Sequence, residues 1–271
     1  MPGTDESATS PVIDTSTPHP ARMYDFWLGG KDNYPVDEEL GRRMMAIEPA
    51  VRDVARANRA FMRRVTRWAA GDGVRQFLDI GTGIPTEPNL HQVAQAVAPG
   101  ARVVYCDNDP IVLAHAEALM QGTPEGATAY AQADVREPEQ ILEQAAEILD
   151  FSRPVQLSLV ALLHFVSDEQ GAYELVARLA DGLAPGSRLV ITHAGYVPGD
   201  DRLGEVDDQY RSGRITLALR SREDIARFFG GFDLLEPGLV RPDQWRPELD
   251  EAPGTRLDPS VAFYAGVARK S

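Results

Sequence analysis

The chain has 271 residues, 43% of them hydrophobic, and a formal net charge of -14 at pH 7. This length suits one large domain, and the apolar content is enough to build a sizeable core. The negative charge would repel a phosphate backbone, so we expect no nucleic-acid partner. A single cysteine excludes an internal disulfide, and no signal peptide or long apolar run is present, so we expect a cytoplasmic protein without a membrane span.

The N-terminal quarter predicts a short tail followed by helices. Residues 1–18 are rich in Ser, Thr, Pro and Asp, a composition typical of disorder. Residues 19–72 predict a helical cap, because apolar side chains recur there at the spacing of one helix face. That face carries Val51, Val54, Ala55, Phe61, Met62, Val65 and Trp68, with Asn58 as a polar interruption.

Residues 73–271 form the predicted main domain, in which short apolar runs alternate with helical segments. Helices are expected over 90–97 and over 168–183, where Ser167 and Gln170 have the spacing of a capping box. Repeated strand, helix, strand units indicate a parallel sheet with helices on both faces. The predicted strands are 76–80, 102–106, 127–131, 155–161 and 188–192.

The last seventy residues break this alternation. After a helix predicted over 221–229, two strand-like runs at 232–240 and 261–268 follow without a helical crossover between them. Two strands joined in this way are expected to be antiparallel. The predicted fold class is therefore α/β, with a Rossmann-like sheet of seven strands that is mostly parallel, an antiparallel C-terminal strand and an N-terminal helical cap.

The clearest motif is a glycine turn after the first predicted strand. Residues 77–83 read Phe-Leu-Asp-Ile-Gly-Thr-Gly, which places Gly81 and Gly83 where a ligand can approach the backbone closely. Asp107 ends the next strand about 24 residues later, where a carboxylate can accept bonds from both hydroxyls of a ribose. This pair of features is shared by dinucleotide enzymes and methyltransferases.

Two neighbours of the glycines favour a ligand without a pyrophosphate. Pro85 stands where dinucleotide-binding turns have a third glycine. Asp79 directly precedes the turn, where its carboxylate would repel a pyrophosphate and attract the ammonium of an amino-acid moiety.

From about residue 76 onward the chain resembles class I S-adenosylmethionine-dependent methyltransferases. Five ordered segments carry the resemblance, namely 78–83, Asp107, 133–135, 162–165 and 183–187. In the N-terminal half, 21–34 and 58–62 resemble a bacterial S-adenosyl methyltransferase family formerly classed as a domain of unknown function. The resemblance then covers 21–269 and implies S-adenosylmethionine as cofactor, S-adenosylhomocysteine as product and a small-molecule methyl acceptor, which it leaves unidentified.

The resemblance and the residue types together predict the cofactor contacts. Asp134 would accept from the adenine amine, unless it only caps a helix, and Arg59 would pair with the cofactor carboxylate, unless it belongs to a solvated stripe with Arg52, Arg56 and Arg63. Residues 24–34 would form a lid, or else a plain helical cap. The predicted cofactor-binding residues are Asp79, Gly81, Thr82, Gly83, Asp107, Asn108, Asp134, Val135, Leu162, Asn33, Tyr34 and Arg59.

His164 and His193, at the carboxyl ends of the fourth and fifth strands, are the candidate catalytic bases, with Tyr196 close to the second. A base is needed only if the nucleophile arrives protonated. The histidines lack a metal-ligand spacing, so we expect no metal. Two other functions stay open: an S-adenosylmethionine-binding sensor without catalysis, and an NAD-dependent oxidoreductase.

Overall fold

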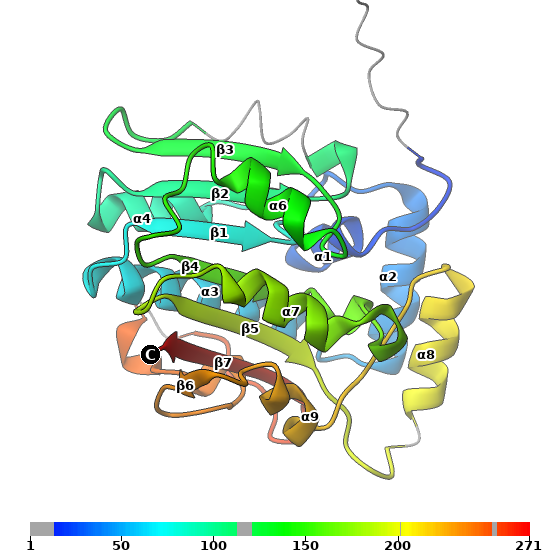
Figure 1. Ribbon diagram of the computed structural model, residues 1–271. Helices are drawn as coiled ribbons and strands as arrows, with labels where there is room; N and C mark the ends of the chain where they lie inside the picture. Colours follow the sequence, from blue (N-terminus) through cyan, green and yellow to red (C-terminus); the bar gives the residue numbers. More distant parts are fainter. Residues whose placement is uncertain (1–13, 113–120, 201, 251–253) are drawn as a thin grey trace, which may run out of the picture.

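The computed structural model describes residues 14–112, 121–200, 202–250 and 254–271, and these build one sheet of seven strands (Figure 1). Across the sheet the strands follow the order β3, β2, β1, β4, β5, β7, β6. Their bounds are β1 Gln76–Ile80, β2 Arg102–Asp107, β3 Ala127–Gln132, β4 Gln156–Val160, β5 Arg188–Ala194, β6 Phe232–Leu234 and β7 Phe263–Lys270.

Strand direction follows the prediction. Neighbouring strands from β3 to β5 pair in parallel, and Asp79 of β1 lies between Tyr105 of β2 and Ser158 of β4. β7 runs antiparallel to both β5 and β6. The order of strands reverses between β1 and β4, and open α/β sheets bind ligands in the crevice at the carboxyl ends of such a pair.

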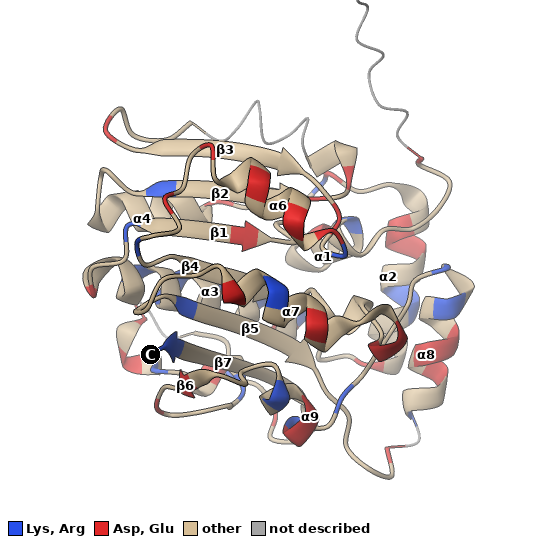
Figure 2. Ribbon diagram, viewed as in Figure 1, with Lys and Arg blue, Asp and Glu red and all other residues tan. Residues whose placement is uncertain are grey.

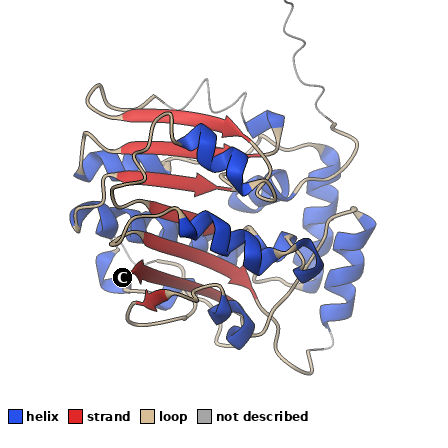
Figure 3. Cartoon of the chain, in the orientation of Figure 1, coloured by secondary structure: helices blue, strands red, loops and turns tan. Residues whose placement is uncertain are grey.

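Helices cover both faces of the sheet (Figure 3). Successive side chains of a strand point to opposite faces, and those of β1 are buried on both, so each face needs helices to cover it. On one face, Phe77 and Tyr105 pack under α3 (Val51–Gly71) and α4 (Leu90–Val97). On the other face, Leu78 and Leu157 belong to the core beneath α6 (Pro138–Ala145), α7 (Ala172–Asp181) and α9 (Arg222–Arg227). α6 is not among the helices that the sequence predicts.

A cap lies at the carboxyl ends of the parallel strands (Figure 1). It consists of α1 (Pro20–Leu28), α2 (Pro35–Ile47) and α8 (Arg202–Ser212), joined by a core that includes Trp27, Met44 and Tyr210. The sequence prediction missed α8. α3 lies within the predicted cap region 19–72, but it also packs on the sheet. The two predicted domains therefore share this helix.

Two predicted elements are shorter in the structure. The helix expected over 168–183 is divided into two. The capping box of Ser167 and Gln170 begins the short 3-10 helix η2 (Asp168–Gln170), and Gly171, with φ of 76°, separates η2 from α7. The strand expected over 232–240 ends at Leu234, because the chain turns where Gly238 has φ of 86° and its N–H donates to the Leu235 carbonyl.

Residues 1–13 of the predicted disordered tail lie outside the described residues. Asp14, in the described part of that tail, contacts the cap, because the Arg22 guanidinium donates twice to the Asp14 carbonyl at 3.3 Å. Acidic side chains are spread over α2, α6, α7 and α8, in line with the net charge (Figure 2). In the described ranges no helix has both the length and the apolar character needed to cross a bilayer.

Candidate functional site

A cavity of about 600 Å³ lies at the carboxyl ends of the parallel strands, beneath the cap. Its floor comes from the turns that follow β1 to β5, and its roof comes from α1, α3, α8 and the segments beside them. The floor contains nine of the predicted cofactor-binding residues: Asp79, Gly81, Thr82, Gly83, Asp107, Asn108, Asp134, Val135 and Leu162.

The glycine turn has the conformation that its composition predicts. Gly81 and Gly83 have φ of 73° and 67°, in the left-handed region that favours glycine. The Gly81 N–H donates to the Cys106 carbonyl at 2.8 Å, which fixes the turn against the end of β2. Leu162 covers Gly81 so closely that a Cβ there would meet its side chain at 2.8 Å. The turn after β4 therefore closes over the turn after β1.

Asp107 organises the same turn through its carboxylate. Oδ2 accepts from the Gly83 N–H at 2.8 Å, and Oδ1 accepts from the Asp109 N–H at 3.0 Å. Burial raises the pKa of Asp107, and these two hydrogen bonds oppose the rise. Each carboxylate oxygen has a second lone pair. The group can therefore accept two more hydrogen bonds from hydroxyls of a ligand.

Asp79 lies on the face of β1 that is covered by α3, as the alternation with Leu78 requires. Burial raises the pKa of Asp79 to about 7, the nearby Asp107 adds to the rise, and Arg59 opposes it. A cationic ligand group would favour the ionised form. The protonation of Asp79 is thus set to change when such a ligand binds.

Two arginines of α3 hold the turn after β1. Arg59 Nη2 donates to the Thr86 carbonyl at 2.5 Å, and Arg63 Nη2 donates to the Glu87 carbonyl at 3.0 Å. Arg63 belongs to the predicted solvated stripe, whereas Arg59 is the predicted partner of the cofactor carboxylate, with the stripe as its alternative. Arg59 also lines the cavity, and its Nε is buried without a partner among the described residues.

Asn58 is a cavity residue that the sequence prediction noted as a polar interruption but did not include among the site residues. The Tyr24 hydroxyl donates its one proton to the Ala55 carbonyl at 3.0 Å. In its 2.9 Å contact with Asn58 the hydroxyl must therefore accept, and Asn58 Nδ2 donates. This assignment leaves Asn58 Oδ1 as an acceptor, buried and without a partner in the described ranges. A polar residue on an otherwise apolar helix face was the available signal.

Asp134 and Asn108 bind each other at the end of the cavity near β3. Asn108 Nδ2 donates to Asp134 Oδ2 at 3.2 Å, and Arg136 Nε donates to Oδ1 at 2.8 Å. The hydrogen bonds from Arg136 lower the pKa of Asp134 to about 2. Asp134 is therefore ionised at neutral pH, and a bond to an amine of a ligand would have to share its oxygens with Arg136.

Comparisons with known proteins agree on one family. A family model described as S-adenosyl methyltransferase matches residues 6–271. A DUF574 family protein from Streptomyces avermitilis MA-4680 has 43% identity and a TM-score of 0.90 over 96% of this chain and 100% of its own. A candidate methyltransferase from Thermobifida fusca YX has 39% identity and a TM-score of 0.85 over 98% of this chain and 99% of its own. No curated protein sequence matches.

The chain belongs to the S-adenosyl methyltransferase family. The enzyme is thus an S-adenosylmethionine-dependent methyltransferase with the Rossmann-like fold, and the fold, enzyme class and cofactor predicted from the sequence are confirmed. The family match also favours this function over the NAD-dependent oxidoreductase.

Two predicted cofactor residues of the methyltransferase lie outside the cavity lining. Asn33 Nδ2 donates to Asp25 Oδ2 at 2.8 Å and to the Gly30 carbonyl at 3.2 Å, so its amide closes the loop after α1. Tyr34 packs against the cluster that contains Ile84 and lies under the Arg22 guanidinium. Of the predicted lid at 24–34, the residues that line the cavity are Tyr24, Asp25, Trp27 and Leu28.

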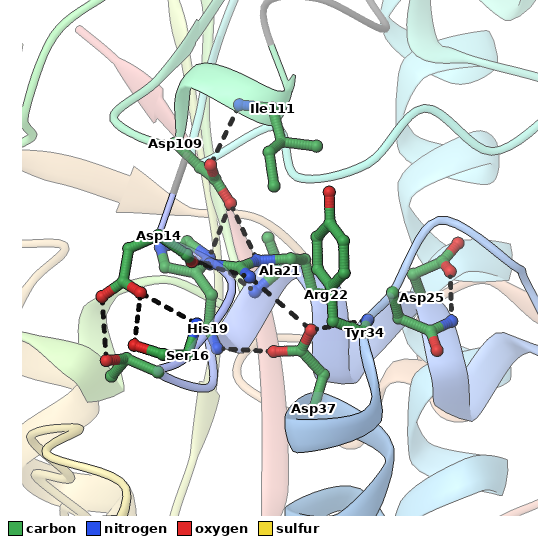
Figure 4. A network of polar contacts seen from close by, with 12 residues as sticks. Asp14, Ser16, His19, Ala21, Arg22, Asp25, Tyr34, Asp37, Asp109 and Ile111 are labelled. Atoms are coloured by element: carbon green, nitrogen blue, oxygen red, sulfur yellow. Dashed lines mark hydrogen bonds and ion pairs between the residues drawn. The ribbon is translucent and has the colours of Figure 1, made fainter. Parts of the chain in front are cut away.

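A polar network ties the N-terminal segment of the methyltransferase to the floor (Figure 4). Asp109 Oδ2 lies 3.3 Å from both His19 Nδ1 and Arg22 Nε. Asp37, buried in α2, accepts from the His19 N–H at 2.8 Å and lies 3.7 Å from Arg22. Asp109 follows Asp107 by two residues. The network therefore fastens the cap directly to the turn that carries Asp107.

The two predicted catalytic histidines have different environments. His164 lines the cavity, as does Tyr196. His193 is fully buried outside the lining, with Nε2 accepting from Arg220 Nη1 at 2.7 Å and Nδ1 donating to the Ala194 carbonyl at 2.7 Å. Burial lowers the pKa of His193 to about 3. Both ring nitrogens are engaged within the protein, so the structure does not bring His193 to the substrate side.

Proposed function

We propose that this methyltransferase transfers the methyl group of S-adenosylmethionine to a small-molecule acceptor, by in-line displacement inside the cavity. The continuity of the cavity from the glycine turn into an apolar chamber under the cap carries this proposal. Its volume of about 600 Å³ falls within the range of about 300–1,000 Å³ typical of small-molecule pockets. The chamber is lined by Trp27, Leu28, Val51, Phe165, Val206, Tyr210, Ile215, Leu217 and Phe263.

Residues of the floor and of α3 fit the charged end of S-adenosylmethionine. Asp79 and Asn58 line the same cavity, and among the described residues Asn58 Oδ1 has no partner. We assign both side chains to the ammonium group, because a carboxylate can pair with it and an amide oxygen can accept a hydrogen bond from it. Arg59, whose Nε is buried without a partner in the described ranges, is assigned to the carboxylate.

The remaining floor residues are assigned to the adenosine. Asp107 keeps the lone pairs needed to accept from both ribose hydroxyls. Asn108 follows it directly, and Asp134 and Val135 stand one strand further along, after β3; we assign these three to the adenine. Gly83 leaves room for the ligand against the backbone, because a Cβ there would meet nothing closer than Ala21 Cβ at 3.8 Å.

S-adenosylmethionine would supply an electrophilic methyl group, whose carbon an acceptor atom attacks in line as the thioether leaves. The protein contributes orientation and exclusion of water, for which the cap and its ion pairs to Asp109 and Asp37 are suited. A sensor without turnover would need no space beyond the cofactor. The presence of the chamber supports turnover instead. A cytoplasmic location and the lack of a nucleic-acid partner stay predictions from the sequence.

Calorimetric titration tests the cofactor assignment. We expect the purified protein to bind S-adenosylmethionine and S-adenosylhomocysteine but not NAD. Asp107→Ala removes the acceptors for the ribose, and we expect it to weaken both adenosyl ligands by about 100-fold. Asp181→Ala, at the exposed end of α7, is the control and keeps full affinity. Binding of NAD alone, or unchanged affinity in Asp107→Ala, would contradict the proposal.

A further inference from the structure

The hydrogen bonding of His164 determines which of its nitrogens carries the proton. The Ala194 N–H donates to His164 Nδ1 at 3.3 Å. A backbone N–H can only donate, so Nδ1 is unprotonated and the neutral ring carries its proton on Nε2. Burial, with His193 and Arg220 nearby, lowers the pKa of His164 and keeps the ring neutral. His164 lines the cavity, so its Nε2–H is a donor for a ligand there, and no residue in the described ranges accepts it.

The orientation of His164 is held from both sides. Buried Arg220 donates to the Leu163 carbonyl at 3.0 Å and to the Val166 carbonyl at 2.8 Å, which fixes the backbone around His164. The Ala218 N–H donates to the His164 carbonyl at 2.8 Å. The alternative tautomer has its proton on Nδ1 and a free lone pair on Nε2. Its Nδ1–H would point at the Ala194 N–H, so two donors would face each other. His164 is thus built to donate to the substrate and is poorly suited to take a proton from it.

The acceptor chamber offers no other free base among the described residues. His193 is engaged elsewhere, and Glu48 at the chamber rim is paired with Arg202 at 2.8 Å. Burial raises the pKa of the Tyr210 hydroxyl, which opposes its ionisation. Asp79 belongs to the cofactor end. None of these groups is therefore placed to remove a proton from the acceptor.

We propose that the methyl acceptor is a mainly apolar small molecule with a delocalised oxyanion, such as an aryl carboxylate, and that His164 Nε2–H binds one of its oxygens while the other attacks. This inference rests on the proposed function. The attacking oxygen forms a bond to the methyl carbon as the methyl–sulfur bond breaks, and the electron pair of that bond stays on sulfur. The anion and the sulfonium give a neutral ester and a thioether, so no proton has to move. Apolar walls such as Phe165 and Phe263, with rings 4.3 Å and 6.1 Å from the imidazole, suit the rest of the molecule.

Two variants of His164 separate its nitrogens. His164→Gln keeps an N–H donor near the position of Nε2. His164→Asn keeps only an acceptor for the Ala194 N–H, near the position of Nδ1. The full-length protein is saturated with S-adenosylhomocysteine and titrated with 3-phenylpropanoate, with benzoate and with their uncharged amides. We expect the carboxylates to bind the wild type and His164→Gln, to bind His164→Asn at least about tenfold more weakly, and to bind better than the amides.

A second measurement does not depend on a variant. In wild-type protein with ¹⁵N-labelled histidine, NMR reports which His164 nitrogen carries the proton, and we expect Nε2, with its proton signal shifted by the carboxylate probes. A proton on Nδ1, equal carboxylate binding in both variants, or no carboxylate binding to the S-adenosylhomocysteine complex would each overturn the inference. If S-adenosylhomocysteine itself failed to bind, the proposed function would fail first, which keeps the two results distinct.

Discussion

At the scale of single residues, Asp79 is the group whose ionisation is most closely linked to the cofactor. Burial raises its pKa to about 7, so below neutral pH the carboxyl group of the free enzyme is protonated and neutral. Pairing with the ammonium of S-adenosylhomocysteine requires the carboxylate. Binding at low pH must therefore release a proton from Asp79, and each unit of pH below 7 costs up to about 1.4 kcal/mol of binding free energy.

The expected outcome is an affinity for S-adenosylhomocysteine that rises up to about tenfold per unit from pH 5 to 7 and is flat above pH 7.5. Calorimetry across this range measures it. Asp79→Asn is expected to remove most of the rise. Methylthioadenosine, which keeps the ribose but lacks the amino-acid group, distinguishes Asp79 from Asp107. If both ligands showed the same slope, the dependence would belong to Asp107 or to the fold.

At the scale of elements, two turns from different strands close on each other. Gly81 belongs to the turn after β1, and Leu162 of the turn after β4 packs directly against it. Ala161, between β4 and Leu162, has φ of 56°, and its N–H is held by Thr192 Oγ1 at 2.8 Å. The positive φ of a residue other than glycine is a strained conformation that the surrounding contacts maintain. The fit of these two turns thus depends on β5 as well.

Gly81→Ala tests this fit. The new Cβ would meet the Leu162 side chain at 2.8 Å and would force alanine into the left-handed region, so we expect a loss of about 1–2 kcal/mol in unfolding free energy and weaker S-adenosylhomocysteine binding. Gly182→Ala is the control, because a Cβ there meets nothing within 4 Å. Urea unfolding and calorimetry give both quantities. Equal behaviour of the two variants would show that the contact at Gly81 is unimportant.

At the scale of the whole molecule, α3 connects the cap, the cofactor floor and the far edge of the sheet. Its cavity side carries Asn58 and Arg59, while Phe61 and Trp68 contact buried Trp245 at ring distances of 5.6 Å and 5.8 Å. Arg64, also of α3, donates to the Trp245 carbonyl at 3.0 Å. The residues near Trp245 therefore anchor the helix that holds part of the site.

Trp245→Ala is expected to lower the unfolding free energy by about 3–5 kcal/mol, because it leaves a cavity under α3. Urea denaturation monitored by circular dichroism measures the change. Leu234→Ala, at an exposed position of the neighbouring β6, is the control and is expected to change the free energy by less than about 0.5 kcal/mol. A small effect of Trp245→Ala would mean that α3 is held mainly by other contacts.

Much of the fold and of the cofactor floor followed from patterns local to the sequence. Short apolar runs predicted β1 to β5, the 3.6-residue periodicity predicted α3, and the spacing of Gly81, Gly83 and Asp107 predicted the turn that they form. These features depend on neighbours a few residues apart, or on the common edge at which parallel strands end. Prediction failed where the sequence signal was short or interrupted, as in α6, α8 and the break at Gly171.

Only the tertiary structure decided how side chains from distant segments share their hydrogen bonds. His164 and His193 look equivalent in sequence, yet Arg220 and the Ala194 carbonyl occupy both nitrogens of His193, while the Ala194 N–H leaves Nε2 of His164 free to donate. Asn58 Oδ1 has no partner in the described part of the chain, and this likewise depends on Tyr24, 34 residues away, which accepts from the amide nitrogen. Periodicity specifies which face of an element is buried, but the partner of a buried polar atom is set by packing between elements, and that partner determines what the atom can do.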